Sequence, residues 1–485
     1  MAQKPRELSP TRSLPDFYGA ELRLMRERAG LSMADLGARI NYDSSLVGRV
    51  ERAQQAPSES FAAACDKALG CDGKFVRLWQ LLDGQRRQPP VGDNAQAPST
   101  ATTSPLGRAY AGAHVSEAGS VGLLGAPVPA DSDVVTVPVL TPEGGVTTMA
   151  IDRRHLLLGL GAAPVAAGLI PLTPDGAGHA ERTPNRVGDT DVGEVLATVQ
   201  ALKLLDNRIG GGSLCATALM ETRRVWRMVN LSRCTDDVAA RLRSAAGELA
   251  IFTGWLHFDA ARRDDAWSLL SEGLTTARLG SDPNVEIHAY AQLSLVAGRS
   301  GRARDAVDLA RAGQRIAGAS APQRLRSLLR VREAQGWSQL GEATECDRAL
   351  GRARDAFDPR TGADDPAWIS FYTEAELEGL DAVCNDGLGQ HTAAQRSYRT
   401  ALDKLPTQYV RNREYFATGY ALASARTGDL DQATDAGHRT LATVSEMSSA
   451  RVRNRLRQLH RSLTDRAPEH AGVRAFDERY RAVLA

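Results

Sequence analysis

Apolar residues recur at every third or fourth position along most of this chain, which is the spacing of a helix with one buried face. Alanine and leucine fill most of these positions, and aromatic residues make up only 5% of the sequence. The spacing is lost at 88–150, where Pro, Gly, Ala, Ser and Thr leave too little apolar surface to offset the entropy of ordering. We therefore predict a mostly α-helical protein with a flexible linker at 88–150.

Two short segments within this linker alternate with the period of a β-strand. VVTVPVL at 134–140 and VTTMAI at 146–151 flank the turn sequence TPEGG, which predicts a short β-hairpin. Pro138 cannot donate a ladder hydrogen bond and would confine its strand to an edge.

Three helices with distinct ends are predicted near the N-terminus, after a polar segment at 1–16 that we expect to be disordered. The first, at 18–29, directs Leu22 and Met25 inward and Arg23 and Arg26 outward. Ser32 can cap a second helix at 33–40, with Asp35 completing a capping box, and Asp43 can cap a third at 44–54. Val47 and Val50 of the third helix point inward. The opposite face then carries Ser44, Ser45, Gly48, Arg49 and Arg52.

This face suits insertion into the major groove of double-stranded DNA. Small residues permit close approach, and arginines reach base edges or phosphates. Solvated charge on an exposed helix is the alternative interpretation of Arg49 and Arg52. Glu51 lies at the edge of the inward face, so we expect it to brace an arginine rather than contact DNA.

The stretch LRLMRERAGLSMADLGARINYDSSLVGRVERAQQAPSESFAAACDKALGCDGKFVRLW resembles the XRE-type helix-turn-helix of actinobacterial regulators, over about residues 17–82. The resemblance implies a lambda-repressor-like domain in which Ser32 and Met33 lie near the DNA backbone. It also implies DNA contacts by Ser44, Ser45, Gly48, Arg49 and Arg52. The sequence departs from the family at Met33, where Gln is usual, and at Ala53, where Gly is usual.

The C-terminal half repeats one short pattern. Gly301, Gly341, Gly389 and Gly428 are separated by 40, 48 and 39 residues, and each precedes Ala or Cys by five positions. An earlier copy keeps the alanine, Ala266, but lacks the glycine. Each copy predicts two helices joined by a tight turn, with a small residue where the helices approach closely.

Segments such as GRARDAVDLARAG and GDLDQATDAGHRTLATV resemble tetratricopeptide (TPR) units, although their spacing is nearer 40 than 34 residues. The resemblance implies a TPR-like α-solenoid that mediates dimerisation and receives an unidentified peptide, protein or small-molecule ligand. Aromatic residues could anchor such a ligand, but at helical spacing they are more often core. These are Trp226, Trp255, Trp267, Trp337, Trp368 and Tyr372.

Composition excludes several other classes of function. The net charge of +1 gives no global field toward nucleic acid or membranes, so any basic surface is local. The six cysteines form no CxxC pair, which argues against zinc and disulfides and favours reduced core residues. RIGGGSL at 208–214 lacks the lysine of a phosphate loop and is read as an interhelix turn. We therefore expect no enzymatic activity, no bound metal and no cofactor.

One apolar stretch, DRRHLLLGLGAAPVAAGLI at 152–170, resembles a twin-arginine export signal but lies far from the N-terminus. Its apolar run is short and contains Pro164, so we expect a small docking helix and no stable membrane insertion.

These observations divide the chain into a disordered N-terminus at 1–16, a helix-turn-helix domain at 17–87, a linker at 88–150, an apolar connector at 151–190 and a repeat domain at 191–485. The function they favour is a cytoplasmic, homodimeric transcriptional regulator that reads operator DNA. The alternative is a TPR-type interaction scaffold without sequence-specific DNA binding.

Overall fold

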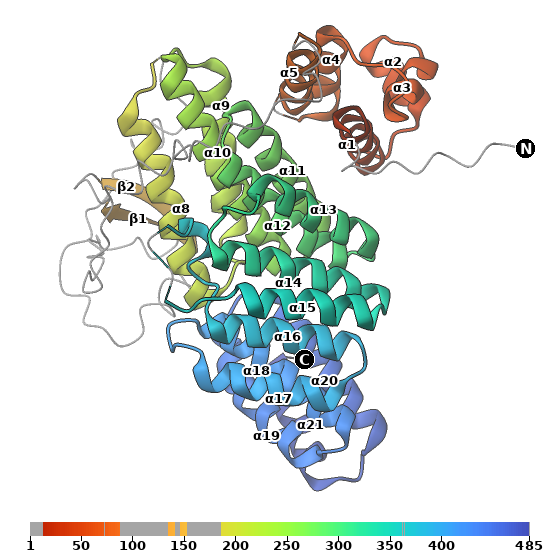
Figure 1. Ribbon diagram of the computed structural model, residues 1–485, viewed down its shortest axis with the longest axis vertical. Coiled ribbons are helices and arrows are strands. Elements are labelled where there is room, and N and C mark those ends of the chain that lie inside the picture. The colour runs from red at the N-terminus through yellow and green to blue at the C-terminus, as the bar shows by residue number, and fades with distance from the viewer. Residues whose placement is uncertain are drawn as a thin grey trace, which may run out of the picture.

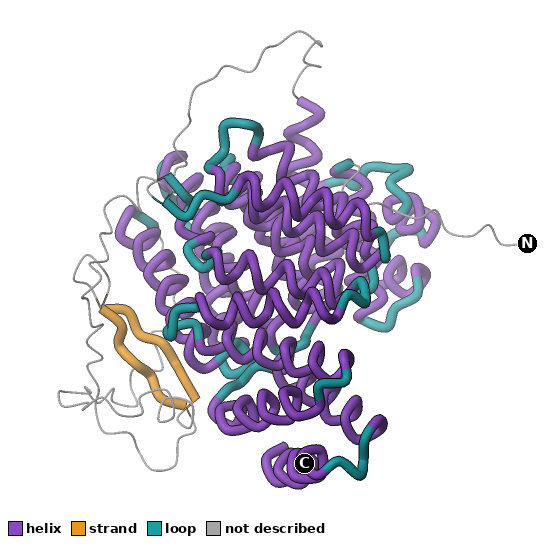
Figure 2. The backbone as a smooth tube through the Cα atoms, turned by 60° about the horizontal axis from the view of Figure 1, so that its bottom comes forward, coloured by secondary structure: helices purple, strands orange, loops and turns teal. Residues whose placement is uncertain are grey.

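The computed structural model describes residues 13–71, 73–87, 134–140, 146–152, 186–360, 362 and 364–484. In these residues a small N-terminal helical domain lies beside one end of a long array of stacked helices (Figure 1). Helices account for most of the described backbone (Figure 2). The predicted mostly α fold, with an N-terminal domain and a C-terminal solenoid-like array, is confirmed.

The N-terminal domain consists of five helices around one apolar core. They are α1 (Leu14–Arg28), α2 (Met33–Ile40), α3 (Ser44–Glu51), α4 (Glu59–Leu69) and α5 (Lys74–Arg87). Helix α1 packs on α3 and α5, while α4 packs on α2 and α5. Leu22, Leu36, Val47, Phe61 and Phe75 form the centre of the core and are fully buried.

Two helix boundaries differ from those expected. Helix α1 begins at Leu14, inside the segment predicted to be disordered, because Ser13 accepts a hydrogen bond from the Asp16 amide and Pro15 lies in the first turn. Helix α3 ends at Glu51, three residues early, because Ala53 adopts a left-handed backbone with φ of 54°.

The array begins with α8 (Asp189–Ile209) and α9 (Cys215–Leu231) and continues as successive antiparallel hairpins. The hairpins are α10 (Asp236–Asp259) with α11 (Arg263–Leu279), α12 (Pro283–Arg299) with α13 (Ala303–Ala317), α14 (Gln323–Leu340) with α15 (Ala343–Ala356), α16 (Glu374–Gly387) with α17 (His391–Lys404), α18 (Val410–Thr427) with α19 (Leu430–Thr443), and α20 (Ala450–Arg466) with α21 (Ala471–Leu484). Short 3-10 turns lie at η2 (Ala367–Ile369) and η3 (Val444–Glu446).

The repeated glycines turn the chain between paired helices. All four have φ between 76° and 90°, a region in which only glycine avoids a steric penalty. The small residues five positions after these glycines are fully buried between helices, as the repeat predicts, and so is Ala266 of the earliest copy; the four are Ala306, Cys346, Ala394 and Ala433. The earliest copy makes the same turn without glycine, because Ala261 there has φ of 61°.

The triple glycine joins α8 to α9, as predicted, and permits close packing. A Cβ on Gly211 would lie 2.9 Å from the Leu256 backbone, and one on Gly212 would lie 2.5 Å from Ser448 Oγ. The Gly212 amide donates to the Ser448 carbonyl at 2.8 Å, and the Ser448 amide donates to Ile209 at 2.6 Å. The first loop of the array is therefore bonded to the segment before α20.

Helix α8 crosses from the first hairpins of the array to the later ones. It packs against both α10 and α18. Near its end, Asp206 accepts hydrogen bonds from Trp255 of α10 and Arg411 of α18, both at 2.9 Å. Beside this, the fully buried Asp259 accepts from Gly211, Ser449 and Arg451. These buried polar contacts hold the first hairpins of the array against the later ones.

The predicted hairpin is also present, as β1 (Val134–Leu140) paired antiparallel with β2 (Val146–Asp152). Pro138 faces Thr148 in this two-stranded sheet, where both strands are edges. The rest of the linker and the helix expected within 152–170 fall outside the described residues.

Five of the six cysteines are buried and free, as expected, whereas Cys234 is exposed and so is not a core residue. Among the described helices, none combines the length and apolar character needed to cross a membrane.

Candidate nucleic-acid interface

The α2–α3 unit is held by local caps that the sequence predicts. Ser32 accepts a hydrogen bond from the Asp35 amide at 3.1 Å, and Asp35 accepts from the Ser32 amide at 2.9 Å, which completes the capping box. Asn41 ends α2 in the left-handed region, and Asp43 then accepts from the Ser45 amide at 2.8 Å to start α3. Hydrogen bonding with the Ser32 and Ser45 hydroxyls, and then with the amides of the same residues, lowers the pKa of Asp35 and Asp43, so both carboxylates stay ionised beside the exposed face.

The exposed face of α3 carries two hydroxyls and a fixed arginine. Ser44, Ser45 and Arg49 are all exposed. Arg49 donates to Ser45 Oγ at 2.9 Å and to Gln55 Oε1 at 2.8 Å. The guanidinium therefore lies along the helix surface. Because its two hydrogen bonds are exposed to solvent, hydrogen bonds to a base edge or a phosphate can replace them.

Gly48 lies differently from the sequence-based expectation. It is buried rather than exposed, because Arg52 and Met33 close over it. A Cβ there would lie 3.0 Å from Arg52 Nη1 and 3.3 Å from Met33 Sδ. Met33 itself is 40% exposed, and Arg52 donates to Gln54 at 2.9 Å. In the free domain, Met33 and Arg52 therefore cover Gly48 and form the surface at the position where Gly48 was expected to be exposed.

A buried ion pair fixes α3 against α1. Arg26 donates to both carboxylate oxygens of Glu51, at 2.6 and 3.0 Å, and to the Leu31 carbonyl at 2.8 Å. Glu51 therefore braces an arginine, as predicted. Arg26 is only 8% exposed, so its expected outward position is wrong. The hydrogen bonds to Glu51 raise the pKa of Arg26 above its usual value.

The domain is anchored to the array through α1 and α5, whereas α3 lies on the side away from the array (Figure 1). Glu21 accepts from Lys74 at 2.6 Å and from Trp267 of α11 at 3.0 Å, and all three side chains are buried. Arg77 forms a buried ion pair with Glu272 of α11. The surface bearing Ser44, Ser45 and Arg49 is therefore held clear of the array.

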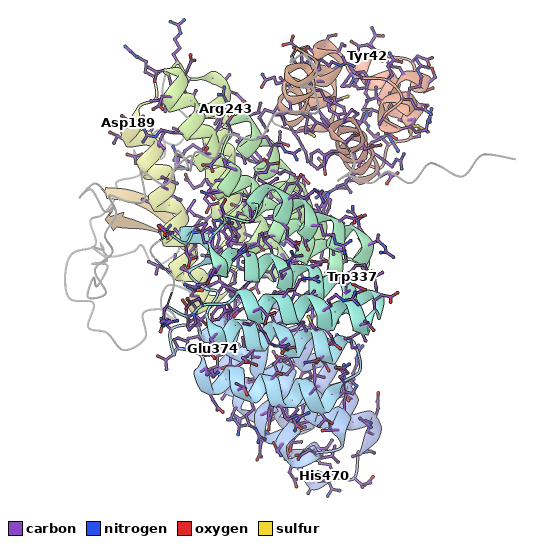
Figure 3. All side chains as sticks on the ribbon, in the orientation of Figure 1. Tyr42, Asp189, Arg243, Trp337, Glu374 and His470 are labelled. Carbon is purple, nitrogen blue, oxygen red and sulfur yellow. The ribbon has the colours of Figure 1, made fainter. Side chains whose placement is uncertain are left out.

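The aromatic residues considered as ligand anchors divide into three groups. Trp226 and Trp267 lie at the domain boundary, where Arg77 covers the Trp226 ring at 5.4 Å. Trp337, midway along the array (Figure 3), and Tyr372 are core residues. Trp255 and Trp368 line a cavity. All of these residues except Trp255 are buried in the core, so the core interpretation is confirmed for five of the six, of which Trp368 also lines the cavity.

Sequence reasoning missed two side chains that shape this surface. Gln54 and Gln55 follow the end of α3 and hold Arg52 and Arg49 through their amide oxygens. The sequence signal that could have identified Gln54 and Gln55 is their position just after Arg49 and Arg52. Tyr42, which Figure 3 labels, donates to Ser60 at 3.1 Å and joins α4 to the turn between α2 and α3.

No group of three His, Cys, Asp or Glu side chains gathers in the described residues as a metal site would require. The surface instead offers hydroxyls, amides and guanidiniums, which can donate hydrogen bonds to nucleic acid.

Comparisons with known proteins address this domain. No curated protein matches the chain. A family model described as a helix-turn-helix domain matches residues 18–79, which run from within α1 into α5. Together with the α2–α3 geometry, this match shows that the chain carries an N-terminal helix-turn-helix domain.

Proposed function

We propose that this chain is a homodimeric transcriptional regulator of the XRE type, similar to those of actinobacteria, in which α3 reads operator DNA. The observation that carries the proposal is the exposed face of α3, with Ser44, Ser45 and Arg49, in a matched helix-turn-helix domain whose α3 lies on the side away from the array. The array acts as a TPR-like solenoid that supports dimerisation and receives a signal. No catalytic activity or cofactor enters this function.

The charges on this surface favour paired binding over binding by one domain. Arg39, Arg49 and Arg52 surround the α2–α3 unit, but the ionised Asp35 and Asp43 offset part of their charge. Because phosphate neutralisation supplies most nonspecific affinity, one such domain gains little from it. Two domains on inverted half-sites double the number of contacts.

The first test is retention of genomic DNA fragments by the purified full-length protein at physiological salt, followed by sequencing. A shared palindromic motif supports a dimeric regulator. Retention without sequence preference, or no retention, contradicts the proposal and favours the interaction scaffold.

Substitutions then separate base contacts from phosphate contacts. Arg49→Ala should reduce discrimination between specific and scrambled DNA by about 1–3 kcal/mol. Arg52→Ala should weaken binding to both and reduce the salt slope by about 1. Lys67→Ala removes the same charge from the exposed surface of α4 and serves as the control. Equal loss of specific and scrambled binding in Arg49→Ala would contradict base reading.

A further inference from the structure

The inner face of the array encloses a cavity of about 140 Å³. Its walls come from α8, from the first helices of the hairpins α10 to α18, from η2 and from the start of α20. An apolar protein cavity of roughly 150 Å³ holds one benzene molecule. The space therefore suits a small organic molecule with about one ring.

Flat aromatic surfaces form part of the wall. Trp368 stacks on His288 with ring centroids 4.2 Å apart and an interplanar angle of 8°. The Trp255 ring lies 4.8 Å from the Arg411 guanidinium and 4.9 Å from that of Arg451. These contacts fix the planes of both indoles, which leaves rigid surfaces for a flat ligand.

The cavity is rich in cations, most of which have carboxylate partners. The basic residues that line it are Lys203, Arg299, Arg332, Arg411 and Arg451, and the acidic ones are Asp206 and Glu376. Arg411 pairs with Asp206 at 2.9 Å, Arg451 with Asp259 at 3.1 Å, and Lys203 with Glu248 at 3.6 Å.

The other two arginines form no ion pair with any carboxylate of the described residues. Arg332 is 4% exposed; its Nη1 donates to Gln335 at 2.9 Å, and its buried Nε has no hydrogen-bond partner there. Arg299 donates to the Tyr415 hydroxyl at 3.2 Å. A buried guanidinium without a counterion is unfavourable, so such a group is expected where a ligand supplies the charge.

Other groups near these arginines offset the charge only in part. Glu376 accepts a hydrogen bond from Asn412 at 2.8 Å; burial raises the pKa of Glu376, while Asn412 and the charges of Arg332, Arg411 and Arg451 act in the opposite direction. Burial also opposes ionisation of Tyr415, yet Arg299, Arg455 and Arg451 outweigh it and lower the Tyr415 pKa to about 8. The lining carries five cations against the two carboxylates of Asp206 and Glu376, so its net charge is positive even with both carboxylates ionised.

We propose that this cavity binds a small organic anion, whose carboxylate pairs with Arg299 and Arg332 while its flat apolar part rests against Trp255 and Trp368. A guanidinium matches a carboxylate through paired N–H donors, which gives both energy and orientation. That this ligand acts as the signal for DNA binding rests on the proposed function. That the cavity binds an anion does not.

Calorimetric titration of the full-length protein with benzoate tests the binding, with the neutral isostere benzamide as the matched ligand. We expect benzoate to bind and to raise the thermal midpoint, and benzamide to bind at least roughly tenfold more weakly, because charged hydrogen bonds are the stronger ones. Phenyl phosphate distinguishes a carboxylate preference from a general preference for anions. Equal binding of benzamide, or binding of neither anion at millimolar concentration, overturns the proposal.

Two substitutions locate the site. Arg332→Met should reduce benzoate affinity roughly tenfold or more while leaving the unliganded protein at least as stable, because it removes an uncompensated buried charge. Arg360→Met removes the same charge at a 90% exposed side chain and should change neither property. Unchanged affinity in Arg332→Met, or a large loss of stability without ligand, would assign Arg332 a structural role instead.

DNA affinity is measured separately, with and without benzoate, on a fragment that the protein selects. A change in wild type that is lost in Arg332→Met identifies the cavity as the sensor. Anion binding that persists without any DNA binding leaves the cavity assignment standing and contradicts only the regulatory function.

Discussion

The buried pair between Arg26 and Glu51 gives the sharpest prediction about the recognition helix. Glu51→Gln removes the only full charge that faces Arg26 from α3 and directs an amide NH₂ toward a guanidinium that also donates. The side chains are 10% and 3% exposed, so water cannot replace the lost partner. Breaking one side of such a pair costs about 3–5 kcal/mol. The contact between α1 and α3 should loosen accordingly.

Hydrogen exchange of the full-length protein measures this loss locally, which avoids assuming that so long a chain unfolds in one step. Amides of α1 and α3 should exchange roughly 150- to 5000-fold faster in Glu51→Gln, the ratio that corresponds to about 3–5 kcal/mol. Amides of α14 and α15 should not change.

Glu27→Gln is the matched control, because Glu27 is 60% exposed and contacts the same Arg26 at 3.4 Å. The double variant Arg26→Met with Glu51→Met should exchange more slowly than Glu51→Gln, since apolar side chains can replace a buried pair at little cost. If Glu51→Gln changes exchange in α3 by less than about tenfold, the ion pair does not hold the helix and the reasoning fails.

Three other substitutions test separate features. Ala261→Gly should stabilise the array by about 0.5–1 kcal/mol in thermal unfolding because it relieves a left-handed alanine, whereas Ala260→Gly, at φ of −76°, should not. Ultraviolet titration should show one tyrosine ionising near pH 8, and Tyr415→Phe should abolish that step. Because the pKa of Tyr415 is lower in the folded protein, its ionisation adds stability as the pH rises from about 8 to 10, and this stability is lost as the pH falls through about 8. Gly212→Ala should cost about 1–3 kcal/mol, since its Cβ would lie 2.5 Å from Ser448 Oγ; an unchanged midpoint would refute the close packing.

Features fixed by neighbouring residues were predictable from the sequence. The caps at Ser32 and Asp43 depend on amides within three residues, and the turns at Gly301 and Gly341 depend on backbone handedness. Glu51 could be assigned correctly because its position on the helix already excluded the groove face.

Features fixed by distant contacts were not predictable. Arg26 was assigned to solvent because it is charged, whereas its position depends on Glu51, 25 residues away. The cavity depends on the pairing of Asp206 with Arg411, 205 residues apart, for which the sequence carries no periodic signal. Gly48 was assigned correctly to its helix but not to its environment, which Met33 and Arg52 determine.

The bonding of α8 to α18, and of the Gly212 loop to Ser448, also determines how the array unfolds. In an open repeat protein each unit contacts only its neighbours, so terminal repeats fray independently and folding propagates from any point. Here the first and late repeats hold each other, which raises the contact order and removes a free end. Deleting α20 and α21 should therefore destabilise α8 and α9 at the opposite end of the array, so that the array melts as one cooperative unit rather than repeat by repeat.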